Sequence, residues 1–219
     1  MRLIKPMQME VKLPDWIVLA ACVAVVGVLG ASIDPRFPPA FDVEALTWIR
    51  SHLEGGLGDA LIQIYRFSGV GFTAFLVLAS IIYVVVKRWW NDLRLLVMAS
   101  GGILVIIDLW LKPWFDRHRP PEKLLLVDGR SFPSGHAAGA VAFYGAMLLI
   151  LAAHHPRWRT PLTIGACLWI SLVWLSTLYV RAHWPTDLLA GAATGLAWLT
   201  LCKALWRDHT SRRSVQPPP

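Results

Sequence analysis

Charged side chains are scarce in this chain. Asp, Glu, Lys and Arg make up 16% of its 219 residues, and 56% of the residues are hydrophobic. A soluble domain carries about a quarter charged residues. No polar stretch is longer than about 35 residues, so no separate soluble domain is left between the apolar runs. This shortage of charge excludes an ordinary water-soluble fold.

Cysteine is also rare. Cys22, Cys167 and Cys202 lie within apolar runs and show no pair spacing. We interpret them as small packing residues, which excludes a disulfide framework and a cysteine metal site. Nothing in the chain resembles a nucleic-acid-binding motif, so the net charge of +7 needs another explanation.

What the chain does contain is a series of charge-free apolar runs, several of which reach the ~18–20 residues that a bilayer span needs. We predict an all-α, polytopic membrane protein with six transmembrane helices. The runs are Trp16–Ile33, Phe67–Val86, Leu95–Ile107, Ala137–Ala153, Thr160–Val180 and Leu188–Cys202. The expected organisation is a basic cytoplasmic tail (residues 1–15), a six-helix membrane domain (16–206) and a disordered basic tail (207–219). A cleaved signal peptide is the alternative for the first run, but its length favours a retained anchor.

The basic residues set the expected orientation. With both termini in the cytoplasm, most of the 21 Lys and Arg residues fall on the cytoplasmic side, as the positive-inside rule requires. The flipped topology is the alternative. A cytoplasmic basic collar favours anionic membrane lipids as partners rather than nucleic acid. The expected location is a bacterial inner membrane, with both termini cytoplasmic and the polar clusters described below at the periplasmic face.

A short amphipathic helix is expected between the first two spans, over Val43–Leu53. Asp42 would be its N-cap, and Leu46, Ile49 and Leu53 recur at helical spacing. Such a helix is typical of a segment that lies on a membrane surface, here the outer one.

One polar cluster marks the start of the fourth span. Pro133 cannot continue a helix, Ser134 is a good N-cap, and Gly135 allows close approach of another atom. His136 then falls in the first helical turn. Free backbone N–H groups beside a hydroxyl and an imidazole form an anion site. A Ser-capped helix with a solvated histidine is the plain alternative.

A second cluster ends the third span. Asp108 and Lys112 are four residues apart, so they face the same side of a helix and can pair. A lysine that merely reaches towards the interface is the alternative. Arg117 and Arg119 follow in the most highly charged outer segment of the chain.

The third cluster, Arg181, His183 and Asp187, lies in the short turn between the last two spans. Together the clusters hold two histidines and several cations but one inner carboxylate, which suits an oxyanion and suits a divalent metal poorly. Two imidazoles allow one nucleophile and one general acid, as phosphomonoester cleavage needs. Asp187 is placed to hold the Nδ1 proton of His183 and leave Nε2 free to attack. No metal or other cofactor is expected.

These residues resemble the motifs of the type 2 phosphatidic acid phosphatase (PAP2) family, which are K-x6-R-P, P-S-G-H and S-R-x5-H-x3-D. The matching residues are Lys112, Arg119 and Pro120, then Pro133–His136, then Ser176, His183 and Asp187. The resemblance covers about residues 67–202. Thr177 departs from it, because the third motif has arginine there. Arg181 lies four residues later, one helical turn along the same face, and we hypothesise that it supplies the missing guanidinium.

The resemblance implies a lipid phosphatase in which His183 attacks phosphorus and forms a phosphohistidine. Asp187 would orient His183, and His136 would protonate the leaving oxygen. The phosphate oxygens would be held by Lys112, Arg119, Ser134, the Gly135 N–H and Arg181. Arg117 is expected to face solvent or a lipid headgroup.

The function that follows is hydrolysis of a lipid phosphate. The substrate would be of the undecaprenyl pyrophosphate, phosphatidylglycerophosphate or phosphatidic acid type. Transfer of the phosphoryl group to another lipid, such as lipid A, is an alternative that shares the first step. Binding of an anion without cleavage is a second alternative, although paired histidines with an orienting aspartate argue against it, since binding alone needs only cations.

Overall fold

The computed structural model describes residues 11–34 and 36–213, with side chains as far as residue 206. In this part of the chain all regular structure is helical, as predicted. The helices are α1 (Leu13–Ser32), α2 (Ala40–His52), α3 (Gly56–Phe67), α4 (Val70–Val86), α5 (Trp90–Leu104), the π-helical segment η1 (Val105–Leu111), α6 (Lys112–Phe115), α7 (Gly135–His154), the 3-10 turn η2 (Pro156–Trp158), α8 (Arg159–Tyr179) and α9 (Pro185–Arg213).

The two expected tails are shorter than predicted. Helix α1 already begins at Leu13, where Pro14 suits the first turn and the Lys12 N–H donates to Asp15 Oδ2 at 3.1 Å. Helix α9 continues to Arg213, so residues 207–213 are helical rather than disordered. Residues 1–10 and 214–219 of the predicted tails lie outside the described residues.

Five helical segments of the described chain are long and apolar enough to cross a membrane. They are Leu13–Ser32, Trp90–Phe115, Gly135–His154, Pro156–Tyr179 and Pro185–Trp206. Helices α3 and α4 meet at a 54° bend, and if this pair counts as one span the total rises to six. The break falls at Ser68 and Gly69, where the Ser68 hydroxyl donates to the Tyr65 carbonyl.

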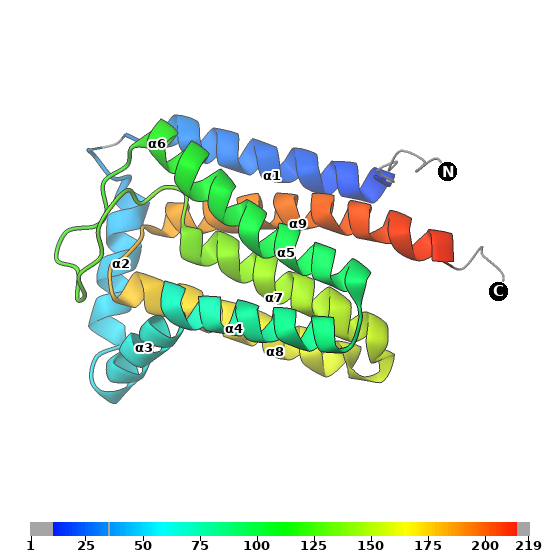
Figure 1. Ribbon diagram of the computed structural model, residues 1–219. Coiled ribbons are helices and arrows are strands. Elements are labelled where there is room, and N and C mark those ends of the chain that lie inside the picture. The colour runs from blue at the N-terminus through cyan, green and yellow to red at the C-terminus, as the bar shows by residue number, and fades with distance from the viewer. Residues whose placement is uncertain (1–10, 35, 214–219) are drawn as a thin grey trace.

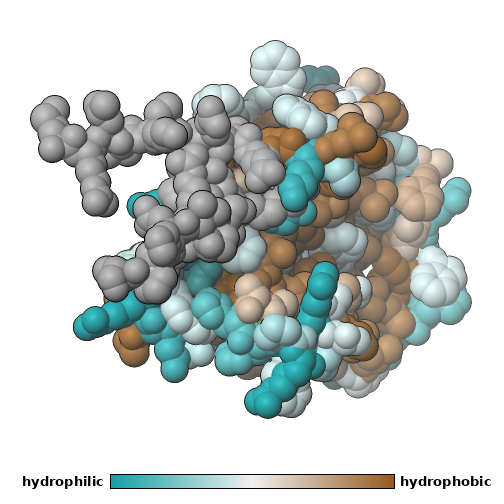
Figure 2. Space-filling model, turned by 90° about the vertical axis from the view of Figure 1, so that its right-hand side faces the viewer, coloured by the Kyte–Doolittle hydropathy of each residue, from teal (hydrophilic) through white to brown (hydrophobic). Residues whose placement is uncertain are grey.

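The outer faces of these helices are apolar. Large hydrophobic side chains are exposed along α1, α4 and α8, including Val23, Ile82 and Leu168. Seen from the end that carries the start of α1 and the last turns of α9, hydrophilic side chains lie beside hydrophobic ones (Figure 2). Exposed apolar area on this scale needs a lipid environment, so the protein is an integral membrane protein.

The helices lie alongside one another, with α7 in contact with α5, α8 and α9 (Figure 1). Helices α2 and α3 lie at the end of the bundle opposite the start of α1, and we call this the site end. Helix α2 spans nearly the predicted range and buries Leu46 and Ile49. Asp42, however, is not its N-cap, because the helix begins at Ala40 and Pro39 holds the cap position. That α2 lies on an outer membrane surface stays a prediction.

Helices α7 and α9 approach each other closely at Gly191 and Gly195, a G-x-x-x-G pair on α9. A Cβ atom on Gly191 would collide with the Ser134 carbonyl oxygen, and one on Gly195 would collide with the backbone of Ala138. The Ser134 N–H also donates to the Asp187 carbonyl at 2.9 Å. These contacts fix the start of α7 against the first turn of α9.

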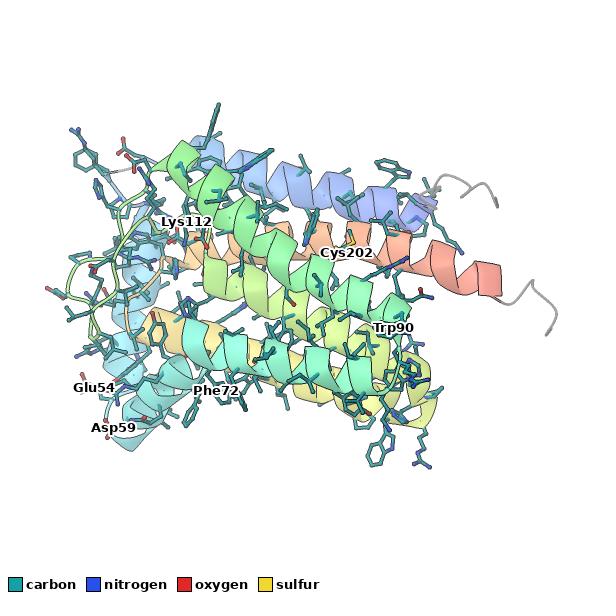
Figure 3. All side chains as sticks on the ribbon, viewed as in Figure 1. Glu54, Asp59, Phe72, Trp90, Lys112 and Cys202 are labelled. Carbon is teal, nitrogen blue, oxygen red and sulfur yellow. The ribbon has the colours of Figure 1, made fainter. Side chains whose placement is uncertain are left out.

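The opposite end of the bundle has its own polar contact. The buried Asp92 carboxylate contacts His154 Nε2 at 2.8 Å and accepts a hydrogen bond from Trp206 Nε1 at 2.8 Å. Trp89 stacks on the His154 ring. Trp90, two residues before Asp92 in the chain, and Lys112 mark the two ends of the bundle in Figure 3. The Asp92 contact and Lys112 are therefore separated by the length of the apolar core.

Candidate active site

A cavity of about 730 Å³ runs from the site end along the faces of α4, α5 and α7. Its polar end is lined by both predicted catalytic histidines and by Lys112 and Arg119. Its remainder is largely apolar, with linings that include Val77, Ile81, Ile103, Leu104 and Phe143. Residues from all three predicted clusters therefore line one cavity, namely Lys112 and Arg119, Gly135 and His136, and His183, with an apolar continuation along the helices.

His183 lies in the turn between α8 and α9 and is 1% exposed. Arg119 Nη1 lies 3.2 Å from Nε2, and since a guanidinium only donates, Nε2 carries the lone pair. The proton is thus assigned to Nδ1, which lies 3.5 Å from Asp187 Oδ2 and has no other partner among the described residues. That separation is too long for a well-formed hydrogen bond. Such contacts tighten when substrate binds.

The environment of His183 favours its neutral form. Burial lowers the pKa of His183 from its ordinary value of 6.5, Asp187 opposes that shift, and Arg119 adds to it. Burial also lowers the pKa of Arg119, which stays protonated at neutral pH. The guanidinium is held by the carbonyls of Asp128, Gly129 and Ala182 as well as by Nε2. A neutral imidazole beside a fixed cation is the state that a nucleophile towards an anion requires.

His136 occupies the first turn of α7, where it was predicted. Its ring centroid lies 5.9 Å from that of His183, and Tyr65 stacks on it at 5.1 Å. Ser134 caps α7, since its Oγ accepts the Ala137 N–H at 3.3 Å. Ser134 is fully buried, and its Oγ is engaged in this cap. The predicted helix start thus sets His136 beside His183.

Lys112 follows η1 and lines the cavity beside the start of α7. Its Nζ contacts Asp108 Oδ1 at 2.6 Å, which confirms the predicted i,i+4 pair. A Cβ atom on Gly135 would lie 3.7 Å from Lys112 Nζ, so the ammonium group borders the N-terminus of α7. The wider π-helical turns before it are common at functional sites.

The site contains no obvious metal cradle. Within residues 11–34 and 36–206, no three His, Cys, Asp or Glu side chains gather in a way that would hold a metal ion. The polar groups that line the cavity include two imidazoles and the cations Lys112 and Arg119, which match an anion. The carboxylates Asp108 and Asp128 line it too, and Asp108 pairs with Lys112.

Comparison with known proteins identifies the family. The family model described as the PAP2 superfamily matches residues 68–211, which include both histidines, Lys112 and Arg119. This chain belongs to the PAP2 superfamily.

Several proteins named as lipid phosphatases are similar in sequence. Phosphatidylglycerophosphatase B of Bacillus subtilis is 33% identical over 121 residues, which is 53% of this chain and 58% of that protein. Lipid A 4'-phosphatase of Bacteroides thetaiotaomicron is 31% identical over 134 residues, 53% of this chain and 57% of that protein. Lipid A 1-phosphatase of Rhizobium johnstonii is 37% identical over 75 residues, 34% of this chain and 27% of that protein. The chain thus matches little more than half the length of the first two relatives.

The fold is also that of a solved PAP2 protein. The crystal structure of a transmembrane PAP2-type phosphatidylglycerolphosphate phosphatase from Bacillus subtilis superposes with a TM-score of 0.74 and 22% identity. The match covers 92% of this chain and 98% of that one. At this identity the likeness establishes the transmembrane PAP2 fold.

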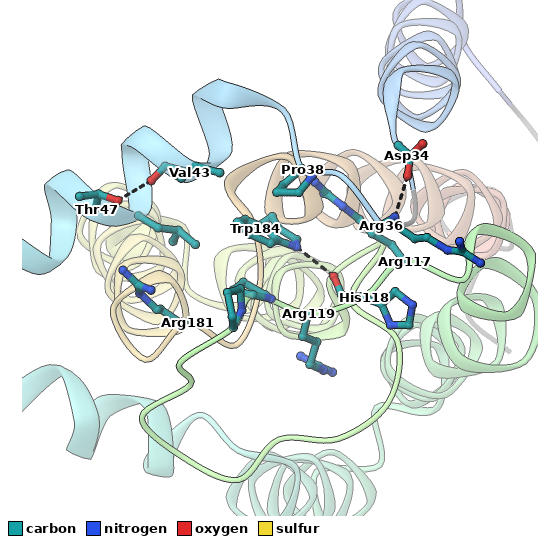
Figure 4. A pocket seen from close by; sticks show the side chains of 13 residues that line it. Asp34, Arg36, Pro38, Val43, Thr47, Arg117, His118, Arg119, Arg181 and Trp184 are labelled. Atoms are coloured by element: carbon teal, nitrogen blue, oxygen red, sulfur yellow. Dashed lines mark hydrogen bonds between the residues drawn. The ribbon is translucent and has the colours of Figure 1, made fainter.

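Arg181 does not lie where the sequence hypothesis put it. Helix α8 ends at Tyr179, and Arg181 has a left-handed φ of +54°, so it is not one helical turn beyond Thr177. Its Nη1 contacts Glu122 Oε2 at 2.8 Å, and it lines a separate cavity of about 260 Å³ (Figure 4). Of the residues described, those that line the larger cavity do not include Arg181. The argument from helical spacing fails because the helix has already ended.

The Thr177 side chain forms its hydrogen bond within α8. Both Ser176 and Thr177 are fully buried, and their hydroxyls donate to the Val173 carbonyl at 2.8 and 2.7 Å. Two of the described cations that line the larger cavity lie beside the predicted catalytic groups. Arg119 contacts His183 Nε2, and Lys112 borders the start of α7.

Arg117 was expected to face solvent or a headgroup, and this expectation is wrong. Arg117 is 1% exposed and lies between two buried carboxylates, Asp42 and Asp187. Thr186 accepts a hydrogen bond from Arg117 and donates its N–H and its hydroxyl to Asp42, and it precedes Asp187 in the chain. Sequence reasoning missed Asp42 and Thr186, because Asp42 is 75 residues from Arg117 and no local pattern joins them.

Proposed function

We propose that this PAP2 protein hydrolyses a phosphomonoester on a membrane lipid, through a phosphohistidine at His183. The observation that carries the proposal is the larger cavity. At its polar end Nε2 of a neutral, buried histidine lies beside a second histidine and two cations, and its remainder is lined by apolar helix faces. A lipid has the same division, with a charged phosphate at one end and an apolar tail.

The proposed chemistry uses both histidines. Nε2 of His183 attacks phosphorus, the P–O bond to the lipid breaks, and His136 gives a proton to the leaving oxygen. His136 then takes a proton from water, which attacks the phosphohistidine, breaks the P–N bond and releases inorganic phosphate. Asp187 holds the Nδ1 proton and stabilises the imidazolium that forms during attack.

Arg119 has two roles in this proposal. In the structure its Nη1 lies 3.2 Å from Nε2 of His183 and occupies the lone pair there. A phosphate in the cavity offers the guanidinium stronger, charged acceptors, so Arg119 turns to the phosphate and frees Nε2. Lys112 and the N–H groups at the start of α7 hold the other oxygens, because they border the same end of the cavity.

The cavity also supports a lipid as the substrate. Leu78 and Leu104 line it and are also exposed on the outer surface, so it opens sideways between α4 and α5. A tail could therefore stay in the bilayer while its phosphate reaches His183. The names of the relatives make phosphatidylglycerophosphate the first substrate to test, with a lipid A phosphate second.

We further propose six spans, with the α3–α4 pair counted as one, and the site end at the periplasmic face of a bacterial inner membrane. The start of α1 and the end of α9 lie at the opposite end of the bundle, which supports placing both on the cytoplasmic side (Figure 1). Helix α2 would then lie at the outer surface.

The deciding experiment is phosphate release by detergent-purified protein. Phosphatidylglycerophosphate, a lipid A phosphate, undecaprenyl pyrophosphate and phosphatidic acid are offered with and without EDTA. We expect EDTA-resistant release that His183→Ala abolishes and His155→Ala, an exposed histidine at the opposite end of α7, leaves unchanged. Labelled phosphate should be trapped on the wild type and not on His183→Ala. Release that survives in His183→Ala would refute the phosphohistidine, and absence of release from every lipid would favour transfer or binding.

A further inference from the structure

A chain of buried charges extends from the nucleophile to helix α2. Asp187 Oδ1 accepts from Arg117 Nη1 at 2.6 Å, and Arg117 Nη2 donates to Asp42 Oδ2 at 2.7 Å. Asp187 Oδ2 meanwhile accepts the Trp184 N–H at 2.8 Å and faces His183 Nδ1. Contacts between side chains therefore run from His183 through Asp187 and Arg117 to Asp42, and we call this series the relay.

Thr186 ties the two carboxylates of this relay together. Its N–H donates to Asp42 Oδ1 at 3.0 Å, its hydroxyl donates to Asp42 Oδ2 at 2.6 Å, and Arg117 donates to the same hydroxyl at 2.8 Å. Thr186 is also the residue immediately before Asp187. A displacement of Asp42 would therefore act on Asp187 through both the side chain of Arg117 and the backbone of α9.

All three of these charged side chains are buried. Asp42 and Asp187 are fully buried, and Arg117 is 1% exposed with its guanidinium 5.4 Å from the Trp184 ring centroid. Buried ion pairs are costly to desolvate, and replacing one by apolar residues often leaves stability unchanged or higher. Stability alone therefore gives a weak reason for a buried carboxylate–guanidinium–carboxylate triad at this point of the fold.

We propose that Asp42 is a positioning residue for the reaction: through Arg117 and Thr186 it fixes Asp187 against His183 and supplies the negative charge that balances Arg117. This inference rests on the proposed phosphohistidine mechanism. It assigns a role to helix α2, which lies outside the residues matched by the family model.

The charges explain why a second carboxylate is needed. Asp187 paired with Arg117 alone would be neutralised and would stabilise an imidazolium poorly. With Asp42 present the triad carries a net charge of about −1 at neutral pH, which is cancelled as the His183 ring becomes cationic during attack. The other charged or titratable groups that face His183 are Arg119 and Lys112, which disfavour the cation, and His136.

A purely structural latch between α2 and α9 is the competing explanation. It predicts lower stability in variants of the triad but gives no reason for a shift in the pH dependence of catalysis. The positioning role predicts such a shift, with a sign set by the charge removed. Removal of a carboxylate lowers the pKa of His183, and removal of the guanidinium raises it.

The test compares pH–rate profiles of four purified proteins, the wild type, Asp42→Asn, Arg117→Gln and the double variant. Since attack needs neutral His183, the acid limb of kcat/KM should move down by about one pH unit in Asp42→Asn and up by a similar amount in Arg117→Gln. The double variant restores the net charge, so its limb should return close to that of the wild type. The substrate ionises identically in every reaction, so differences between variants report on the protein.

Turnover provides a second readout. Asp42→Asn should lower kcat about 10- to 100-fold with KM changed less than about threefold, because Asp42 lies outside the larger cavity. Thr186→Val removes hydrogen bonds without removing charge, so it should lower kcat and leave the acid limb unmoved. Asp92→Asn is the matched control, since it perturbs a buried carboxylate with two side-chain partners at the opposite end of the bundle. It should lower the Tm and leave kcat and the limb unchanged.

The outcomes separate the two explanations. The positioning role would be overturned if Asp42→Asn had the same acid limb and the same kcat as the wild type, even if its Tm fell as in Asp92→Asn. Shifts of the limb in the same direction in Asp42→Asn and Thr186→Val would overturn the charge argument, and this comparison holds even if Arg117→Gln does not fold. Absence of both phosphate release and trapped phosphoenzyme in the wild type would refute the proposed function itself, and this inference with it.

Discussion

The close contact between α7 and α9 makes Gly191→Ala a sensitive test of how the site is assembled. A Cβ atom at this position would meet three backbone atoms of Ser134, with the carbonyl carbon and the nitrogen at 3.1 Å and the oxygen closer still. Backbone atoms cannot rotate away as a side chain can, so the helices must separate by roughly 0.5–1 Å to restore van der Waals distances. That movement would also stretch the 2.9 Å hydrogen bond from the Ser134 N–H to the Asp187 carbonyl.

The expected size of the effect follows from this displacement. Overpacking of a tight contact costs about 1–3 kcal/mol, which exceeds the ~1 kcal/mol that Ala gains over Gly in a helix. Helix α7 carries His136 and the N-terminal N–H groups, whereas α9 carries Asp187. A misplacement of about 1 Å between catalytic groups costs roughly 100-fold in rate. We therefore expect Gly191→Ala to lower both the Tm and kcat, the latter by about two orders of magnitude.

The assay is phosphate release and thermal unfolding in the same detergent, with Gly165→Ala as the matched control. Gly165 is also a helical glycine, in α8, and a Cβ atom there would meet nothing within 4 Å. Gly165→Ala should keep the wild-type rate and an equal or higher Tm. If Gly191→Ala behaved like Gly165→Ala in both measurements, the argument that this contact aligns the two motifs would be refuted.

Three further predictions follow from the site. Thr177→Ala should keep a near-normal rate, because the Thr177 hydroxyl donates its hydrogen bond to the Val173 carbonyl within α8. A loss above tenfold in phosphate release would contradict this. Arg181→Ala should keep its rate within about threefold, since Arg181 pairs with Glu122 outside the larger cavity; a drop of 100-fold would revive the hypothesis that it grips the phosphate. Burial holds the pKa of His183 below 6.5, and attack needs the neutral ring, so nucleophilic competence is lost only as the pH falls through that lowered value. The acid limb of kcat/KM, corrected for ionisation of the substrate, should therefore lie below pH 6.5, and a limb above it would contradict the assigned environment.

Local patterns predicted the parts of the site that local physics controls. Ser134 caps α7 as predicted, because a side-chain acceptor acts within one turn. The pairing of Asp108 with Lys112 follows from helical spacing alone. The predicted order of the spans then places His136 and His183 at the same end of the bundle, where their ring centroids lie 5.9 Å apart.

The remaining features depend on contacts that no local pattern encodes. Arg117 stands in a highly charged segment, which is typical of a solvated loop, yet its two carboxylate partners lie 70 and 75 residues away in sequence. Arg181 was misplaced because the prediction extended α8 beyond Tyr179, where the chain in fact turns through a left-handed residue. In both cases the error came from tertiary structure that overrides a sound local rule.

The sideways opening of the larger cavity between α4 and α5 has a kinetic consequence. A substrate that reaches His183 along this route arrives by diffusion in two dimensions, and its relevant concentration is its mole fraction in the surrounding lipid or detergent. Dilution of mixed micelles with buffer should therefore leave the rate unchanged, whereas addition of inert detergent at constant substrate should lower it. Water-soluble phosphate esters, which lack a tail to partition, should be turned over poorly at any accessible concentration.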